Sequence, residues 1–442
     1  MTFKSINYVQ GFEMNSLRNY VILFATVPLL MSSSPAAFAD EAPPIEAFLL
    51  EGQLDEGAAA MRRVIDNDPN DQEARFSLGM VQFFKAIEGL GQDQFRYGLL
   101  GGRARAIPFM RLPVPENPEP EQISYEKARA VLQRLIDRIK KAEQTLSAVN
   151  PEGVRVPLKL GQVRLDLNGD GEHLDQETIW HVSQVLQNPR LRDADAAPKD
   201  FQIVFDGGDV IWLQGYCHAL SALGEIVLAH DWQDQFERCG HLLYPNVDTP
   251  YEFLTDEGPG QFMSFGAQNI FDFVAWLHTI NYEVVEPERM QKALMHMETV
   301  VRLSRESWKL INAEDDDDRE WVPNVNQQSV MKGFDVGQNV ITGWHEFLDE
   351  AELILQGKKL VPFWRGIEGG ISPFGRPEFH PEIGINVRRI FTEPTRFDLA
   401  LWLQGTGLQP YLERGEITSP DDWQKMMRNF NGRFLNYTLW FN

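Results

Sequence analysis

The sequence has little cysteine, no recognisable motif of nucleophilic or phosphate chemistry and no long uninterrupted hydrophobic run. Only 2 of the 442 residues are cysteine, so disulfides cannot be the main scaffold. There is no G-x-S-x-G elbow and no phosphate-binding glycine loop. The segment "WHEFLDEAE" (344–352) is not a zinc motif, since Asp349 occupies the position where that motif has its second histidine. The sequence therefore predicts no particular reaction, and an enzyme is the less favoured class.

Basic charge is also scarce. The chain has 41 Lys and Arg against 64 Asp and Glu, for a formal net charge of -23. Such a surface repels phosphate backbones, so we expect no nucleic-acid partner. Hydrophobic residues make up 43% and aromatic residues 11% of the chain, as in folded globular proteins. The acidic run "EDDDD" (314–318) is interpreted as a solvated loop.

The apolar run near the start, "VILFATVPLL" (21–30), is too short for a comfortable membrane span. It precedes Ala37-Phe38-Ala39, which fits a small-x-small cleavage site. We therefore predict a signal peptide at 1–39, with translation starting at Met1 or Met14. The mature chain would be exported to a periplasmic or extracellular space and would have no membrane span. Export permits a Cys217–Cys239 disulfide, and two buried thiols are the alternative.

Hydrophobic periodicity predicts a mainly α fold, a multi-helix bundle or repeat-like array with minor extended segments. Ser124 is a candidate helix cap and Pro420 a first-turn residue. The aromatic residues near the C-terminus are assigned to the core. The expected helical segments are 44–95, 124–149, 175–187, 208–232, 266–281, 287–312, 337–356, 396–404 and 420–435, with 154–167 extended and 361–394 irregular.

Composition also suggests boundaries between parts of the mature chain. The Gly- and Pro-rich stretch 101–122 predicts a loop. It separates a helical segment, 40–100, from a second part, 123–198, in which a helix precedes a short acidic loop. The remaining residues, 199–442, form a large helical body to which the sequence assigns no function.

Residues 52–90 contain a pair of helical segments joined by "DPND" (68–71). Gly52 and Pro69 stand at the spacing of the tetratricopeptide family, and Ala74, Leu78 and Gly79 stand where its next helix makes close contacts. The segment resembles about one and a half tetratricopeptide repeats. The resemblance implies a surface for a protein partner, whereas an ordinary helical hairpin is the alternative interpretation.

The strongest motif is "DLNGDGEHLDQE" (166–177), which matches D-x-[DN]-x-[DN]-G-x5-E in full. Calcium prefers six to eight oxygen ligands, several of them anionic. Asp166, Asn168 and Asp170 offer side-chain oxygens, Glu172 its carbonyl, and Glu177 both carboxylate oxygens. The stretch resembles an EF-hand loop and implies a bound Ca²⁺ that stabilises local structure. A metal-free turn that caps a helix is the alternative.

A second candidate lies in the nearly all-apolar segment 208–232. Gln214, His218, Ser221 and Glu225 fall on one face at helical spacing, and "DGGD" places Asp206 and Asp209 at its start. A His with a Glu could perform acid–base chemistry in a cavity. The alternative function is therefore an enzyme or small-molecule-binding protein with a cavity lined by His218 and Glu225. The simpler interpretation is a hydrogen-bond network between helices.

Overall fold

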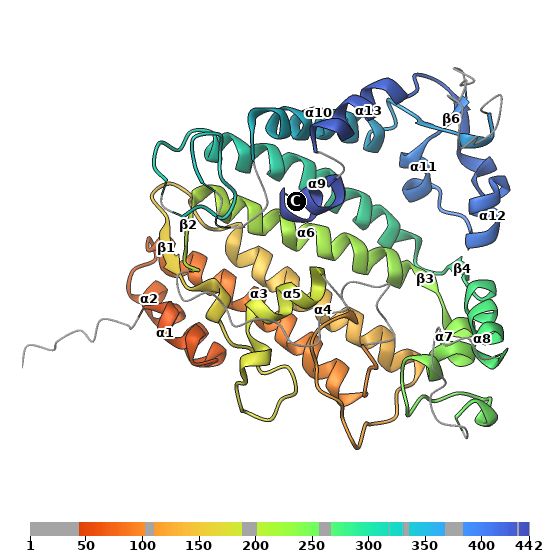
Figure 1. Ribbon diagram of the computed structural model, residues 1–442, viewed down its shortest axis with the longest axis horizontal. Coiled ribbons are helices and arrows are strands. Elements are labelled where there is room, and N and C mark those ends of the chain that lie inside the picture. The colour runs from red at the N-terminus through yellow and green to blue at the C-terminus, as the bar shows by residue number, and fades with distance from the viewer. Residues whose placement is uncertain are drawn as a thin grey trace, which may run out of the picture. The chain divides into compact units, whose positions relative to one another are not determined.

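The fold was analysed in a computed structural model that describes residues 44–101, 110–187, 201–255, 267–317, 319–328, 330, 336–366, 383–430 and 433–441. Within these ranges the chain forms fourteen α-helices and a few short antiparallel strand pairs (Figure 1). The predicted mainly α fold is confirmed. The predicted signal peptide, 1–39, lies outside the described residues. None of the described helices is both long and apolar enough to cross a membrane.

The longer helices pack in an order that largely follows the chain. Near the centre of Figure 1, α6 and α9 lie side by side, and their contact is the most extensive between two elements. The chain of contacts runs through α1 (Ile45–Leu50), α2 (Leu54–Asn67), α3 (Gln72–Arg96), α4 (Tyr125–Leu146), α6 (Gly207–Ala229), α9 (Pro287–Ile311), α10 (Gln338–Leu355) and α13 (Pro420–Asn429).

Shorter elements complete the fold. The other helices are α5 (Ile179–Gln187), α7 (Gln233–Cys239), α8 (Ala267–His278), α11 (Val387–Thr392), α12 (Leu399–Gln404) and α14 (Phe434–Phe441). The antiparallel pairings are β1 (Arg155–Leu158) with β2 (Ile203–Asp206), β4 (Asn281–Val284) with β3 (His230–Asp231) and β7 (Phe397–Asp398), and β6 (Ile383–Ile385) with β5 (Val361–Pro362) and β8 (Leu412–Arg414).

Side-chain caps explain where several helices begin. The Ser124 hydroxyl accepts a hydrogen bond from the Lys127 amide at 3.3 Å at the start of α4. The cap predicted at Ser124 is therefore confirmed. At the start of α6, the Asp206 carboxylate accepts from the Gly208 amide at 2.7 Å, and the Asp209 carboxylate accepts from the Asp206 amide at 3.2 Å. These bonds satisfy amides that a helix start leaves unpaired.

The N-terminal helices form a hairpin against α4. The turn at 68–71 joins α2 to α3, as the sequence predicts. Gly79 on α3 allows a close approach, because a Cβ there would lie 2.6 Å from the Leu146 side chain. A small residue is thus required where α3 meets α4. The helical hairpin is present, and the tetratricopeptide relationship stays a prediction.

Two large hydrophobic clusters stabilise the array. The first extends from α1 to the first half of α6, and the second extends from the end of α6 through α9 and α10 to the C-terminal helices. Phe430, Tyr437, Trp440 and Phe441 are buried in the second cluster, so their assignment to the core is confirmed. Cys217 and Cys239 are buried free thiols, which agrees with the alternative to a disulfide.

Two expectations about the C-terminal region need correction. Part of 361–394, expected to be irregular, contains β5, β6 and α11, and Asn386 caps α11 by accepting from the Arg389 amide at 3.2 Å. The single helix expected at 420–435 is instead α13, which ends at Asn429, followed by α14. In both places the helices and strands are short, so they contain too few residues for hydrophobic periodicity to be recognised in the sequence.

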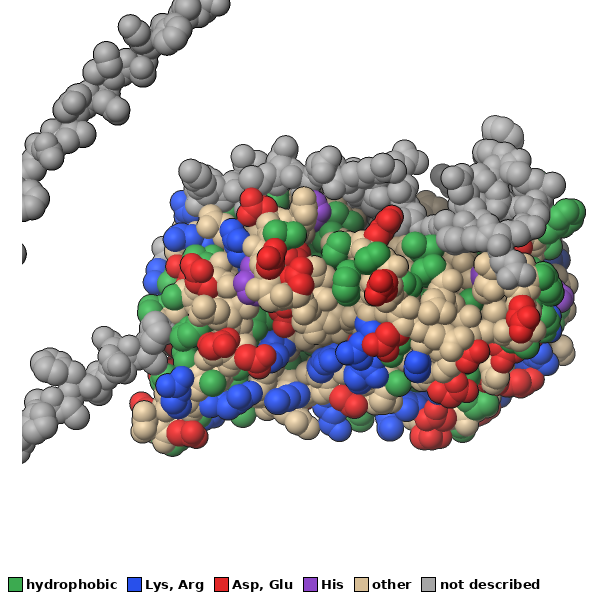
Figure 2. Space-filling model, turned by 90° about the horizontal axis from the view of Figure 1, so that it is seen from below, with side chains coloured by type: hydrophobic (Ala, Val, Ile, Leu, Met, Phe, Trp, Pro, Cys, Tyr) green, Lys and Arg blue, Asp and Glu red, His purple; other side chains and the backbone are tan. Residues whose placement is uncertain are grey.

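Net acidity does not make every face acidic. Figure 2 shows a face on which Lys and Arg side chains gather next to Asp and Glu side chains, with hydrophobic side chains between them. Among the described residues, ion pairs such as Lys85–Asp55 and Arg238–Asp234 join side chains of opposite charge.

Candidate functional site

The loop 166–177 folds into a tight turn organised by its own Asx side chains. The Asp166 carboxylate accepts hydrogen bonds from the amides of Gly169 at 2.7 Å and Gly171 at 3.1 Å. Asn168 accepts from the Asp170 amide at 3.1 Å. Both glycines have φ of 77°, in the left-handed region that glycine adopts without strain. Glycine therefore fits position 171, the sixth of the loop, without strain.

Glu177 folds back toward the start of this loop. Its two carboxylate oxygens accept hydrogen bonds from the amides of Leu167 at 2.9 Å and Leu174 at 3.0 Å. The side chain is only 2% exposed. Burial raises the pKa of Glu177, and repulsion from Asp166 and Asp170 adds to the rise, which the two amide bonds oppose. A cation beside a buried carboxylate that two other anions repel would stabilise its charged form.

The ends of the loop are held together without an entering helix. Arg164 forms an antiparallel bridge with Thr178, and the Leu165 amide donates to the Glu177 carbonyl at 3.0 Å. Glu177 belongs to a short 3₁₀ turn, and α5 starts two residues later. The extended segment expected before the loop and the helix expected after it are therefore both present, although a short 3₁₀ turn precedes the α-helix.

The loop is docked on α3 and on the turn before α2. Gln92 on α3 donates to the Asp166 carbonyl at 2.9 Å, and the Asp166 amide donates to Glu88 at 2.9 Å. On the other side, the His173 ring packs so closely on Gly52 that a Cβ there would lie 2.5 Å from it. The position of the loop is thus coupled to the N-terminal helices.

Glu88 provides a pH-dependent test of this docking. Burial raises the pKa of Glu88 to about 7, and the Asp166 carboxylate contributes to the rise. A raised carboxyl pKa lowers stability as pH increases from about 4.5, where the unfolded chain ionises, to about 7. We expect Glu88→Gln to leave stability unchanged at pH 4 and to increase it by about 2 kcal/mol at pH 8 in chelator. Urea unfolding at both pH values measures this, and an equal effect at both would contradict it.

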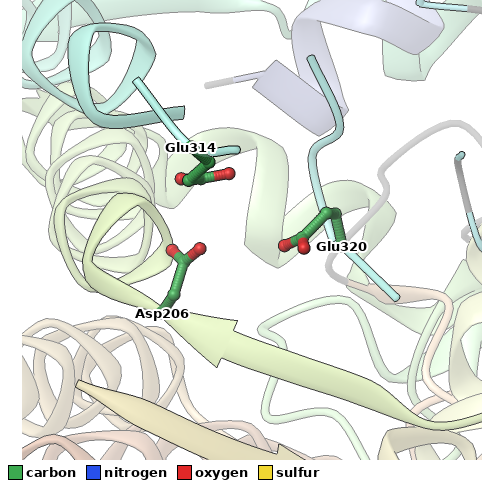
Figure 3. A group of neighbouring side chains, drawn as sticks. All are labelled: Asp206, Glu314 and Glu320. Carbon is green, nitrogen blue, oxygen red and sulfur yellow. The ribbon is translucent and has the colours of Figure 1, made fainter. Parts of the chain in front are cut away.

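A second acidic site brings together two parts of the chain that are distant in sequence. Asp206 ends β2, Glu314 follows α9, and Glu320 lies in the loop beyond it. Each offers an oxygen, and these oxygens all lie within 4.8 Å of one another. Figure 3 shows the three carboxylates turned toward a common space. Carboxylates so arranged could hold a metal ion, although their chemistry does not specify which one.

Among the described residues this is the one group of three or more His, Cys, Asp or Glu with that spacing. The carboxylates of Asp166, Asp170 and Glu177 in the loop are more widely spaced. An EF-hand-like loop also uses an amide side chain and a backbone carbonyl, so its ligands are not all carboxylates.

Burial and mutual repulsion dominate the electrostatics of the acidic group. Burial raises the pKa of Glu314 to about 9, with repulsion from Asp206 as the next cause. Burial likewise raises the pKa of Asp206 and of the neighbouring Asp209. A proton held between Asp206 and Glu314 would relieve the repulsion between their carboxylates. A cavity of about 320 Å³ opens beside the group.

The backbone at this site contains a conformational outlier. Arg319, next to Glu320, has φ of 73°, which is uncommon for a residue other than glycine. Its carbonyl accepts a hydrogen bond from the Val204 amide on β2 at 3.4 Å. Backbone strain of this kind costs on the order of 1 kcal/mol and is concentrated at functional sites.

Local sequence patterns predict only part of this group. Asp206 is expected at a helix start, Glu314 is expected in a solvated run, and Glu320 is not among the candidate site residues. Glu314 is instead partly buried, and Glu320 is 3% exposed. The available signal was the apolar "WVP" (321–323) directly after Glu320, which indicates that the acidic run returns to the core.

The polar face of α6 makes contacts between helices. His218 Nδ1 lies 2.7 Å from His296 Nδ1 on α9, and its Nε2 lies 3.6 Å from the Glu143 carboxylate on α4. Glu225 pairs with Arg289 on α9 at 2.8 Å. Neither the cavity beside Asp206 nor the larger one described below is lined by His218 or Glu225. These contacts agree with the simpler interpretation, an internal hydrogen-bond network.

The Glu225–Arg289 pair can be tested as a structural element. We expect Arg289→Met to lower the free energy of unfolding by about 2 kcal/mol, because Glu225 would remain buried without its cation and could recover only by taking up a proton. Arg302→Met removes an exposed pair with Glu306 and should cost about 0.5 kcal/mol or less. Denaturant unfolding measures both, and equal effects would contradict the structural role.

Comparison of the chain with models of known protein families, with characterised proteins and with solved structures finds no match. Functional inference therefore rests on the residues and geometry described above.

Proposed function

We propose that this protein is exported and binds Ca²⁺ through the loop 166–177, which thereby stabilises the surrounding structure. The ligands are the side chains of Asp166, Asn168 and Asp170, the carbonyl of Glu172 and the carboxylate of Glu177. The observation that carries the proposal is the inward fold of Glu177, whose buried carboxylate is repelled by Asp166 and Asp170. Hard oxygen donors around a glycine-dependent turn suit Ca²⁺.

Other features support a structural role for the ion. The loop contacts both α3 and the turn before α2, so an ion within it would stabilise the N-terminal part of the array. The helices in 40–100 provide surfaces for protein contacts, as the resemblance to tetratricopeptide repeats implies. An isolated loop of this kind has modest affinity, on the order of 10⁻⁴ M, as in extracellular modules.

Native mass spectrometry of the exported chain, with calcium and with EGTA, tests the proposal. We expect each chain to carry one calcium ion, which EGTA removes. The mass of the metal-free chain should correspond to a sequence that starts near Asp40. Calorimetry should show calcium binding, and chelator should lower the melting temperature. No bound calcium at millimolar concentration, together with an unchanged melting temperature in chelator, would refute the proposal.

A further inference from the structure

A large apolar cavity lies away from both acidic sites. Its volume is about 610 Å³, within the usual range for small-molecule sites of roughly 300–1,000 Å³. It lies among α4, the end of α6, α7 and the segments around α11 and α12. No described residue that lines it carries an Asp, Glu, Lys or Arg side chain. Its wall includes Leu132, Ile226, Phe236, Tyr282, Phe397 and Trp402.

The helices that form this wall explain why it is apolar. Because α6 is apolar nearly all round, it needs partners on every side. Along most of its length α4 and α9 supply them. Near its end, Ile226 and Val227 line the cavity and are only partly buried, as are Val131 and Leu132 across from them on α4. Apolar side chains that face an internal space without full burial are available to a ligand.

The few polar groups in the wall limit the kind of ligand that the cavity can bind. His230 Nδ1 lies 2.7 Å from the Ile226 carbonyl, which can only accept, so the proton is on Nδ1. Burial lowers the pKa of His230 and favours its neutral form. The wall therefore carries no formal charge, and the surface that it presents to the cavity is mostly hydrocarbon.

We propose that this cavity binds a neutral, hydrophobic small molecule. Neutrality is required because a charged group would lose its hydration in the cavity without finding a counter-ion. The proposal is independent of calcium, so its experiments are done in EGTA.

Displacement of the neutral fluorescent probe N-phenyl-1-naphthylamine tests the ligand class. We expect saturable probe fluorescence that methyl dodecanoate displaces at a concentration at least about tenfold lower than dodecanoate does, because the two differ in the charge of the head group. Absence of saturable binding, or equal displacement by ester and anion, would overturn the proposal.

Filling the cavity locates the site. We expect Leu132→Trp to abolish probe binding without lowering the melting temperature, because the larger side chain occupies empty space. Leu223→Trp is the matched control, since Leu223 lies on α6 but is 55% exposed and does not line the cavity. If Leu132→Trp does not fold, Val227→Phe tests the opposite wall. Undiminished probe binding in a folded cavity variant would show that the cavity is not the site.

Discussion

Replacing Glu177 with Gln will weaken calcium binding at least about 100-fold, which corresponds to roughly 2.7 kcal/mol. The amide offers one neutral oxygen in place of two charged ones, at the position that closes the loop over the ion. At a calcium concentration about 100 times its dissociation constant, the wild-type protein should gain about 2.7 kcal/mol of stability. The variant should gain almost none. Calorimetry and thermal unfolding, each with calcium and with EGTA, measure both effects.

Glu172 provides the matched control for this experiment. It lies in the same loop and is exposed, and the proposed ligand at this position is its carbonyl. Glu172→Gln makes the same chemical change and should keep nearly all of the calcium response. Comparing each variant with and without calcium cancels any intrinsic effect on folding. Equal loss of binding in both variants, or in neither, would contradict the ligand assignment.

The metal-free protein will lose stability as pH rises from about 5 to 9, and one acidic group will account for about 4 kcal/mol of the loss after allowance for solvent screening. This group consists of Asp206, Asp209 and Glu314, whose pKa values are raised in the folded protein, and Glu88 contributes a further loss below about pH 7. Below about 3.8, the ordinary pKa of an aspartate, the folded and unfolded chains both hold most of these protons, so the group has little effect. Above that pH the unfolded chain ionises freely while the folded chain must give up buried protons, so stability falls.

Urea unfolding in chelator across this pH range measures how steeply the free energy of unfolding falls with pH. We expect Glu314→Gln to reduce the loss by about 2 kcal/mol, because a neutral amide can share a hydrogen bond with Asp206 without taking up a proton. Asp315→Asn removes one charge from the adjacent exposed position and should follow the wild-type curve. A slope in Glu314→Gln as steep as that of the wild type would exclude this group as the cause.

Local patterns in the sequence predicted the long helices and one of the two acidic sites. Helix α4 was predicted because Ser124 and an apolar stripe occur within one continuous segment. The loop 166–177 was predicted because its donors occur within twelve residues. In both cases the structure depends on neighbours along the chain, and the spacing of residues carries that information.

The other acidic site and the cavity could not be predicted in the same way. Asp206 and Glu314 come together only because α6 and α9 pack along their lengths, which no local pattern specifies. The cavity combines residues of α4 and α6 with Phe397 and Trp402 from the C-terminal region. Composition suggested a solvated acidic run at 314–318, because the sequence does not indicate which carboxylate of such a run turns inward.

Because His173 packs against Gly52, the proposed ion would also stabilise the N-terminal helices, which provide none of its ligands. A weak site stays largely empty where free calcium is scarce, as inside a cell, and fills where calcium is abundant, as outside it. The N-terminal hairpin would then be held loosely before export and firmly afterwards. Such a chain acquires its full resistance to proteases only at its destination, and amide hydrogen exchange at 45–67 would slow on adding calcium.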